Sequence, residues 1–436
     1  MGLATGLIGR LTPAVGAWTG RHFAALAVGL LVAIVVRLVL LPAAELTGDL
    51  DQFVLWTRGI ATAPLSQAYD QNVSFPPVMV YIWGLLAAIE PAFRTVTDAS
   101  DPGIRALMKV PACLADLGLA LGVAWVLRSR PTWAVAGALG IALHPAVIDV
   151  SAWWGQYESI YVLIALVAYL LAVGGHPGWA AVALAFAVMT KPQALPLLVP
   201  FAAWYLGRFG YRETFRYAIV GAAVIALLWL PFLPAGGPSA YLRNLSEYQD
   251  EIFAVLSLRA WNPWWLVQEA YAGGNFIADS AVIAGPVTMR HVGFALAAVF
   301  EGIVFLAVVR ATSARNLALG LAAAALVAFC ALTTMHERYA YAALVFLVPL
   351  LHDRRVLAVW LVFGIFFALN LLAAAPPTPD IGRLLPIAGP LGILGSVAIT
   401  ASAVTILVLL LSGRREAGPA SPVRTNGRSA GATSGA

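Results

Sequence analysis

The stretch FAALAVGLLVAIVVRLVLLPAAELTGDLDQ, residues 23–52, decides the fold. Its first part, residues 23–41, is an apolar run of helical length interrupted only by Arg37. A helix needs about 20 mostly apolar residues to cross the hydrocarbon core of a bilayer. The run therefore predicts a membrane-spanning helix. The polar TGDLDQ segment that follows it, residues 47–52, predicts a structured element at the membrane surface.

The rest of the chain has the composition of a membrane protein. Of its 436 residues, 61% are hydrophobic and 11% are charged, whereas soluble domains average about 45–50% and about 25%. So little charge cannot cover a water-facing surface of this size. The composition excludes a soluble enzyme, a disordered protein and a nucleic-acid-binding module, and it predicts an all-α polytopic membrane protein.

Apolar runs of spanning length predict about 12 transmembrane helices, within a range of about 11–13. The runs are 23–41, 106–127, 132–150, 158–174, 178–190, 193–207, 217–234, 291–309, 316–333, 339–351, 355–375 and 386–411. A further run, 77–90, is short and opens with a proline pair. We expect one transmembrane domain over residues 1–412, with a helical first outer loop at 42–105 and a second long outer loop at 235–290. The tail at 413–436 is rich in Gly, Ser, Ala and Arg, and we expect it to be disordered and basic.

Arginine placement predicts the orientation. Short arginine-bearing loops occur at 128–130, 208–216, 310–315 and 354–355, and cytoplasmic loops collect Lys and Arg. All of them fall on one side, together with both termini, if segment 77–90 does not cross the membrane. Most Asp and Glu residues then fall on the outer face, which favours chemistry or binding there.

The first polar group on that face contains Asp49 and Asp51. Two carboxylates two residues apart diverge by about 200° on a helix, so we expect them to play different roles. A partly buried aspartate can act as a general base towards an acceptor hydroxyl. The alternative is that both acids cap the next helix and solvate the loop.

Two further groups enter apolar helices on the same face. Trp154, Gln156 and Glu158 combine an aromatic face with amide and carboxylate groups, as sugar-binding pockets do, although tryptophan is also common at membrane interfaces. Lys191 and Gln193 lie in a turn between two spans. Lys191 can neutralise a phosphate, or it can be a snorkelling lysine at a helix end.

The densest polar turn is His336-Glu337-Arg338. Arg338 can clamp a phosphate with two parallel hydrogen bonds, and His336 can donate to that phosphate or shuttle a proton. The alternative is a helix-capping turn. The sequence contains no metal-ligand cluster, no P-loop and no dinucleotide fingerprint, so we expect no metal and no cofactor. Within the spans, we expect Asp116 and Glu301 to form hydrogen bonds between helices.

Together these motifs resemble those of the GT-C membrane glycosyltransferases. The segments GDLDQ at 48–52, with Trp56 following, and FPP at 75–77 resemble the first lumenal loop of the dolichyl-phosphate-glucose-dependent glucosyltransferases. That family carries a Gly-Asp-Tyr-Glu-type motif, a following Trp and a Tyr-Pro-Pro-Leu segment. The turn at 335–338 is similar to its His-Glu-Lys turn, with Arg in place of Lys. The order of motifs matches from about residue 23 to 352.

The chain departs from the family at two places. Residues 154–159 stand where the family has a His-Gly-His-Phe-Gln-Tyr-like segment, and both histidines are absent here. The second acid of the first motif is Asp51 rather than Glu. The HERY turn and the compact size resemble those of bacterial GT-C enzymes.

The resemblance implies inverting transfer of a hexose, mannose or glucose, from a polyprenyl-phosphate sugar. The implied acceptor is a lipid-linked glycan or a cell-envelope polysaccharide on the outer face of a bacterial plasma membrane. The expected partners are this donor, this acceptor and membrane lipids, with no nucleic acid. The expected catalytic residues are Asp49 and Asp51. Lys191, His336 and Arg338 are expected to bind the donor phosphate, and Trp154, Gln156, Glu158, Gln193 and Glu337 the substrates.

Two other functions stay open from the sequence. One is a secondary transporter of about 12 spans, although such transporters often have two related halves and the halves of this chain look unrelated. The other is a non-catalytic subunit that binds lipid-linked glycans.

Overall fold

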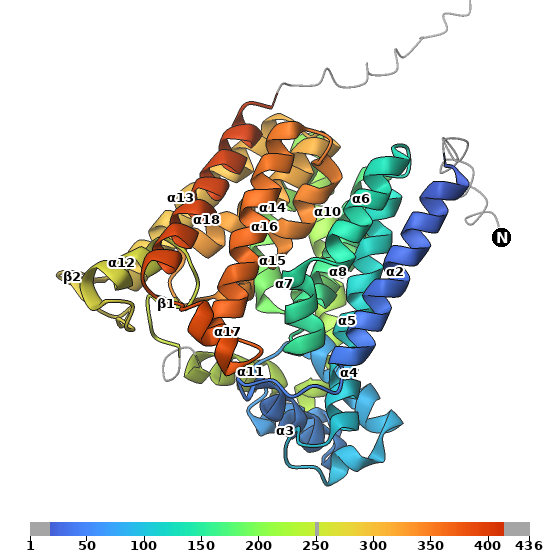
Figure 1. Ribbon diagram of the computed structural model, residues 1–436, viewed down its shortest axis with the longest axis vertical. Helices are drawn as coiled ribbons and strands as arrows, with labels where there is room; N and C mark the ends of the chain where they lie inside the picture. Colours follow the sequence, from blue (N-terminus) through green and yellow to red (C-terminus); the bar gives the residue numbers. More distant parts are fainter. Residues whose placement is uncertain (1–17, 249–252, 414–436) are drawn as a thin grey trace, which may run out of the picture.

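Apolar runs of helical length form helices throughout residues 18–248 and 253–413, which are the residues that the computed structural model describes. The long helices lie side by side as a bundle, with shorter helices gathered at one end (Figure 1). The long helices are α2 (Gly20–Leu40), α5 (Pro102–Val126), α10 (Leu198–Trp229), α13 (Met289–Arg310), α14 (Ala314–Ala331), α16 (Arg354–Ala374) and α18 (Pro390–Leu411). The predicted tail lies outside the described residues, apart from Gly413.

Shorter helical elements complete the bundle. They are α6 (Pro131–Ala142), α7 (Pro145–Ile148), the π-helix η4 (Asp149–Trp153), α8 (Glu158–Val173), α9 (Pro177–Val188), η5 (Pro192–Leu197), η8 (Glu337–Ala340), α15 (Tyr341–Leu347) and η9 (Val348–Leu350). Within the described residues, seven helices are long and apolar enough to cross a membrane, or eight if the bent pair at 131–153 is one span. The prediction of an all-α, multi-pass membrane protein is therefore confirmed.

The count of twelve spans stays a prediction. Each predicted run is largely helical, but α8 and α9, with 16 and 12 residues, are shorter than a span. The runs 193–207 and 217–234 correspond to two helical segments of α10 with its flanking 3₁₀ turns, and the segments meet at Gly210, where the backbone is not helical. Gly210 has φ +77°, in the left-handed region that glycine adopts without a Cβ clash.

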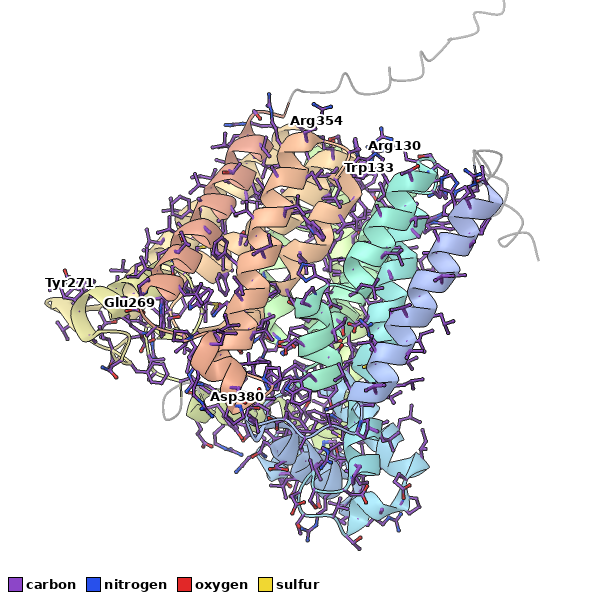
Figure 2. The ribbon with its side chains drawn as sticks, viewed as in Figure 1. Arg130, Trp133, Glu269, Tyr271, Arg354 and Asp380 are labelled. Atoms are coloured by element: carbon purple, nitrogen blue, oxygen red, sulfur yellow. The ribbon has the colours of Figure 1, made fainter. Side chains whose placement is uncertain are left out.

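The arginine-bearing turns gather at one end of the bundle. Trp18 Nε1 donates to the carbonyl oxygen of Arg128 at 2.8 Å, which brings the start of α2 beside the turn after α5. Arg315 pairs with Asp353 at 3.1 Å across the ends of α14 and α16. Figure 2 shows Arg130 and Arg354 at this end and Asp380 at the opposite end. The arginine-bearing turns and the short helix α17 (Pro379–Leu384), which contains Asp380, thus lie at opposite ends of the bundle.

The first long loop folds into a helical unit at the end away from the arginine-bearing turns (Figure 1). It contains α3 (Asp49–Thr62), η2 (Leu65–Gln71), α4 (Pro77–Ile89) and η3 (Pro91–Arg94). These elements share an apolar cluster with the start of α5, and Phe53, Trp56 and Trp83 lie within it. Segment 77–90 is therefore the 13-residue helix α4, packed inside the first loop.

The second long loop is pinned to the turn after α14. It contains α11 (Gly237–Glu247), β1 (Ser257–Leu258), α12 (Pro263–Ala272), β2 (Val282–Ala284) and β3 (Val287–Thr288). Strand β1 pairs in parallel with β4 (Met335–His336), with Ser257 opposite Met335. Asp279 accepts hydrogen bonds from Arg290 at 2.8 Å and from Thr333 at 3.1 Å. The loop is thereby held against the polar turn at 335–338.

Polar residues inside the bundle follow the prediction in one case and contradict it in the other. Asp116 on α5 accepts hydrogen bonds from Arg37 on α2 at 2.8 Å and from Tyr341 on α15 at 3.3 Å, so it joins three helices as expected. The expectation for Glu301 is wrong within the described residues, where neither of its carboxylate oxygens has a hydrogen-bond partner.

Candidate functional site

Asp49 is positioned by a capped helix start. Gly48 has φ +78° and precedes the first residue of α3. The carboxylate of Glu45 accepts hydrogen bonds from the backbone N–H groups of Gly48 at 3.1 Å and Leu50 at 3.2 Å, which satisfies donors that a helix start leaves unpaired. The helix therefore begins at Asp49, with its carboxylate beside the bundle.

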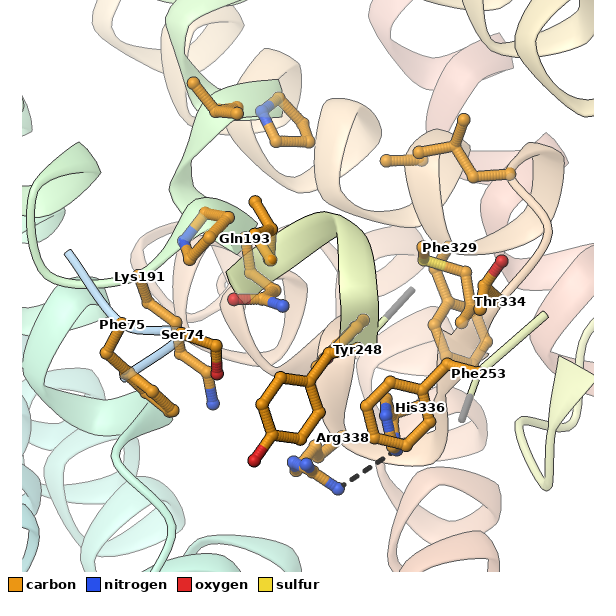
Figure 3. Close-up of a pocket in the computed structure, with 18 of the residues that line it drawn as sticks. Ser74, Phe75, Lys191, Gln193, Tyr248, Phe253, Phe329, Thr334, His336 and Arg338 are labelled. Atoms are coloured by element: carbon orange, nitrogen blue, oxygen red, sulfur yellow. Dashed lines mark hydrogen bonds between the residues drawn. The ribbon is translucent and has the colours of Figure 1, made fainter. Parts of the chain in front are cut away.

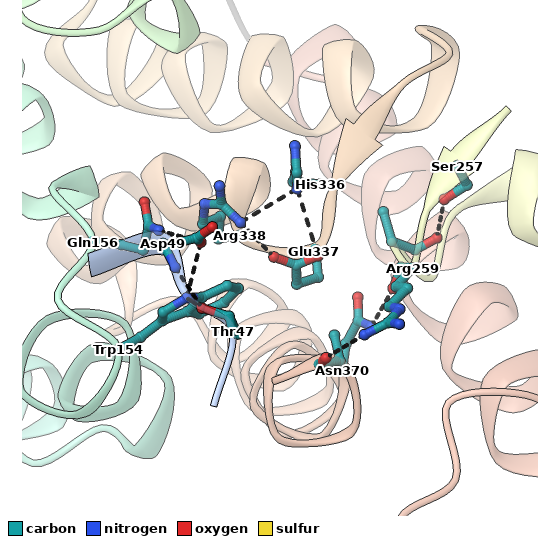
Figure 4. A network of polar contacts seen from close by, with 12 residues as sticks. Thr47, Asp49, Trp154, Gln156, Ser257, Arg259, His336, Glu337, Arg338 and Asn370 are labelled. Carbon is teal, nitrogen blue, oxygen red and sulfur yellow. Dashed lines mark hydrogen bonds and ion pairs between the residues drawn. The ribbon is translucent and has the colours of Figure 1, made fainter. Parts of the chain in front are cut away.

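The carboxylate of Asp49 is held from one side (Figure 4). Its Oδ2 accepts hydrogen bonds from Trp154 Nε1 at 3.0 Å and from Gln156 Nε2 at 2.7 Å. Between these two donors lies Gly155, whose φ of +85° turns the chain so that both side chains reach the same oxygen. Its Oδ1 accepts no hydrogen bond from the residues described.

A group of paired charges lies beside Asp49. Lys191, in the turn before η5, pairs with Glu158 at the start of α8. Arg338 on η8 contacts the same carboxylate, Nε to Oε1, at 3.3 Å. Arg338 also donates to Glu337 at 2.8 Å. Lys191 and Arg338 are 3% and 8% exposed, so both cations are held by carboxylates away from bulk water.

Aromatic rings flank the two cations. The guanidinium carbon of Arg338 lies 4.7 Å from the ring centroid of Trp154. The Lys191 ammonium lies 5.5 Å from the ring centroid of Phe75. Such contacts attract a cation to the ring face, and they fix where each positive charge sits.

His336 is held as a neutral donor. Arg338 Nη1 lies 3.3 Å from His336 Nδ1, and a guanidinium can only donate, so Nδ1 accepts and the ring proton is on Nε2. Burial lowers the pKa of His336 well below its usual value, and the positive charges of Arg338 and Lys191 lower it further. The ring therefore presents an N–H group without a net charge.

Burial also shifts the pKa values of the surrounding charged groups. It raises the pKa of Asp49, an effect opposed by Arg338 and by the hydrogen bond from Trp154. It raises the pKa of Glu337 against the effect of Arg338, and it lowers the pKa of Lys191 against the effect of Glu158. A carboxyl group whose pKa is raised is suited to take up a proton from a neighbouring hydroxyl group.

These groups meet at one cavity of about 750 Å³ (Figure 3). Its polar end is lined by Asp49, Gln52, Gln156, Lys191, Gln193, His336 and Arg338. Its other arm is apolar and runs between η5, α11, α13 and α14, where it is lined by Leu195, Pro196, Leu242, Leu245, Phe294, Ala325, Ala328, Phe329 and Leu332. The cavity thus has a polar end that contains charged side chains and an arm that is lined by apolar side chains.

The structure brings together nine of the ten residues predicted from sequence. Six of them line the cavity: Asp49, Gln156, Lys191, Gln193, His336 and Arg338. Trp154, Glu158 and Glu337 lie behind the lining and hold residues in it.

Asp51 is the exception. It is exposed on the other side of α3, does not line this cavity, and accepts a hydrogen bond from the backbone N–H of Ala99 at 2.7 Å. This contact ties α3 to the loop before α5. The structure therefore places Asp51 apart from the other nine predicted residues, at a position that anchors the first loop, and its catalytic role stays a prediction.

Several lining residues carried no role in the sequence prediction. Gln52 and Trp56 follow Asp49 by three and seven residues, the helical spacing of one face, which is the signal that could have found them. Tyr248 and Phe253 come from the second loop and Arg290 from the first turn of α13, and no spacing in the sequence connects them to Asp49. Among the described residues, no group of three or more His, Cys, Asp or Glu side chains could hold a metal ion.

Comparison with protein-family models gives no match for this chain, and comparison with curated proteins gives none.

Proposed function

We propose that the protein is an inverting glycosyltransferase that moves a hexose from a polyprenyl-phosphate sugar to a lipid-linked or cell-envelope glycan. The observation that carries the proposal is the single cavity. It joins the unshared oxygen of Asp49 to the cations Lys191 and Arg338 and continues into an apolar groove. A base, a phosphate site and a lipid-chain site are the three features that this reaction needs.

The apolar arm suits the lipid chain of the donor. Its lining combines aliphatic side chains with Phe294 and Phe329, and Arg290, which pairs with Asp279, lies one turn from Phe294 on α13. A polyprenyl chain in this arm would bury apolar surface, worth about 25 cal/mol per Å² removed from water. The phosphate would then lie at the polar end, beside Lys191 and Arg338.

Asp49 is proposed as the general base. The acceptor hydroxyl gives its proton to Oδ1 of Asp49 while its oxygen forms a bond to the anomeric carbon of the hexose. The bond between that carbon and the phosphate oxygen breaks, and its electron pair leaves with the lipid phosphate. One displacement inverts the anomeric centre, as it does in one-step inverting glycosidases.

The cations are proposed to stabilise the leaving group. A phosphodiester carries one negative charge and the released phosphate monoester gains a second, so the charge grows at the phosphate as the bond breaks. Fixed hydrogen-bond donors that point at the charge developing in the transition state accelerate a reaction strongly when the site is shielded from water. Glu158 and Glu337 hold Lys191 and Arg338 in position, and the Nε2–H group of His336 adds a neutral donor.

The proposed setting is a bacterial plasma membrane, with about 12 spans, both termini in the cytoplasm and the cavity on the outer face. This orientation follows from the arginine-bearing turns, which lie at the end of the bundle opposite Asp380 (Figure 2).

Purified protein tests the activity directly. Incubation with a radiolabelled polyprenyl-phosphate hexose and a bacterial lipid extract is expected to move the label into a larger glycolipid. Binding of the donor without transfer would point to a non-catalytic subunit. Passage of a solute across proteoliposomes without transfer would point to a transporter.

A further inference from the structure

One wall of the cavity carries polar atoms that the protein leaves unpaired. We call it the α3 wall, and it consists of Gln52, Phe53, Trp56, Phe75 and Gln156. Within the part of the chain that the structure describes, Trp56 Nε1 and Gln156 Oε1 are buried and have no hydrogen-bond partner. A buried donor or acceptor without a partner costs about 1–3 kcal/mol, so native proteins rarely keep one without a reason.

The orientation of Gln156 follows from chemistry. Its amide nitrogen faces Oδ2 of Asp49 at 2.7 Å, and a carboxylate can only accept. The amide oxygen is therefore the unpaired atom, and it lies next to the proposed base. It can accept a hydrogen bond from a hydroxyl group that is held close to Asp49.

The complementary group, a hydrogen-bond donor, is the indole N–H of Trp56, which lies on α3, the helix that begins at Asp49. Asp49, Phe53 and Trp56 are spaced by four and three residues, so they share one face of α3 and span about 10 Å along its axis. Trp56 is 3% exposed, and its indole packs at 5.8 Å from the ring of Phe75 and at 6.2 Å from the ring of Tyr248. Among the described residues, the wall thus combines aromatic rings with one buried unpaired donor and one buried unpaired acceptor.

We propose that the α3 wall is the subsite for the acceptor sugar, with Trp56 donating to one of its oxygens and Gln156 accepting from one of its hydroxyls. A carbohydrate hydroxyl both donates and accepts, so one ligand satisfies both atoms, while the aromatic rings contact the apolar face of its ring. This inference rests on the proposed function, because the sugar on this wall is the one whose hydroxyl Asp49 deprotonates.

A matched pair of variants separates sugar binding from packing. Trp56→Phe keeps an aromatic ring and removes the unpaired N–H. Trp83→Phe makes the same change in the same cluster, 5.6 Å from Trp56, but Trp83 does not line the cavity and its Nε1 donates to Tyr157 at 3.2 Å. W83F therefore loses an internal hydrogen bond and is expected to lower Tm more than W56F does.

The test is saturation-transfer NMR on the purified full-length protein in a detergent that carries no sugar. The probes are methyl glycosides of glucose, mannose and galactose. Wild-type protein and W83F are expected to bind at least one of them with similar affinity. W56F is expected to bind it roughly three- to tenfold more weakly, the loss of one neutral hydrogen bond. Equal affinity in W56F and wild type, or no binding to wild type, overturns the subsite.

The transfer assay distinguishes this failure from failure of the proposed function. With varied acceptor, W56F is expected to raise KM for the acceptor by the same factor and to leave KM for the polyprenyl-phosphate donor unchanged. A rise in the donor KM instead contradicts the subsite. If wild-type protein binds glycosides in the predicted pattern yet transfers no sugar, the proposed function fails, while the α3 wall stands as a sugar-binding surface and not as an acceptor subsite.

Discussion

The side-chain amide of Gln156 donates to Oδ2 of Asp49 across 2.7 Å and so joins segments that lie 107 residues apart in the chain. Trp154 donates to the same oxygen at 3.0 Å. Two donors on one oxygen hold the carboxylate in place, and Oδ1 accepts no hydrogen bond from the described residues. The relationship makes Asp49 the group around which the site is built.

Trp154 is expected to tune the pH dependence through Asp49. A base works only when ionised, so kcat/KM falls as the pH drops through the pKa of Asp49. The hydrogen bond from Trp154 lowers that pKa. Trp154→Phe removes the bond, and we expect the acidic limb of the pH–rate profile to move to higher pH. Trp153→Phe is the control, and it should leave the limb in place. An unmoved limb, or one moved to lower pH, in W154F contradicts this role.

Lys191 and Glu158 are expected to be energetically coupled. Both side chains are buried, and a buried charge left uncompensated costs about 3–5 kcal/mol. Glu158→Gln removes the partner of Lys191, whereas Lys191→Met leaves Glu158 in contact with Arg338 at 3.3 Å. Lys191→Met and Glu158→Gln should each lower the thermal stability of the purified protein. The double variant should be more stable than the sum of the two losses predicts.

The exposed pair of Glu213 and Arg216 provides the control for this cycle. Their side chains are 40% and 73% exposed, and such exposed pairs contribute little to stability because solvent screens them. Glu213→Gln should leave the unfolding temperature nearly unchanged. Strictly additive losses in the Lys191 and Glu158 variants would show that the two groups do not stabilise each other.

His336 is expected to serve through the N–H at Nε2 and not through proton transfer. Gln extends its amide nitrogen to about the position of Nε2, whereas Asn reaches only the position of Nδ1. His336→Gln should therefore keep most of the transfer rate, and His336→Asn should lose roughly tenfold, the value of a hydrogen bond to a charged group. Steady-state kinetics with varied donor measure both. Equal loss in the two variants would instead indicate a proton-transferring imidazole.

The two ends of the bundle are expected to face opposite sides of the membrane. Single cysteines at Asp380 and at Arg354, both exposed, can be introduced after Cys113 and Cys330 are replaced by Ser. A membrane-impermeant maleimide should label the cysteine at 380 in intact cells. It should label the cysteine at 354 only after permeabilisation. The reverse labelling pattern would contradict the proposed orientation.

Much of the fold could be predicted because a membrane-spanning helix is encoded by a local run of apolar residues. The run before Asp49 forms α2, and the arginine-bearing turns share one end of the bundle. The number of spans could not be predicted in the same way, because α8 and α9 end after 16 and 12 residues. Those lengths depend on packing between helices and not on hydropathy.

The site was predictable in its residue types and not in its contacts. Asp49, Lys191 and Arg338 stand out as polar groups beside apolar runs. The sequence contains no sign that Glu158 pairs with both cations, since the pairs join turns that only tertiary packing brings together. The helical divergence of Asp49 and Asp51 predicted different roles, but not that Asp51 would bind the backbone of Ala99.

The pair Asp49→Asn and Asp51→Asn tests the proposed function most directly. Both variants exchange one carboxylate for an amide on the same turn of α3, but only Asp49 lines the cavity. The measurement is the rate of sugar transfer from a radiolabelled polyprenyl-phosphate hexose by purified protein. We predict that D49N loses roughly 10²–10⁴-fold, the contribution of a general base, while D51N keeps the wild-type rate. Transfer by D49N at the wild-type rate, or an equal loss in D51N, would contradict the assignment of Asp49 as the base.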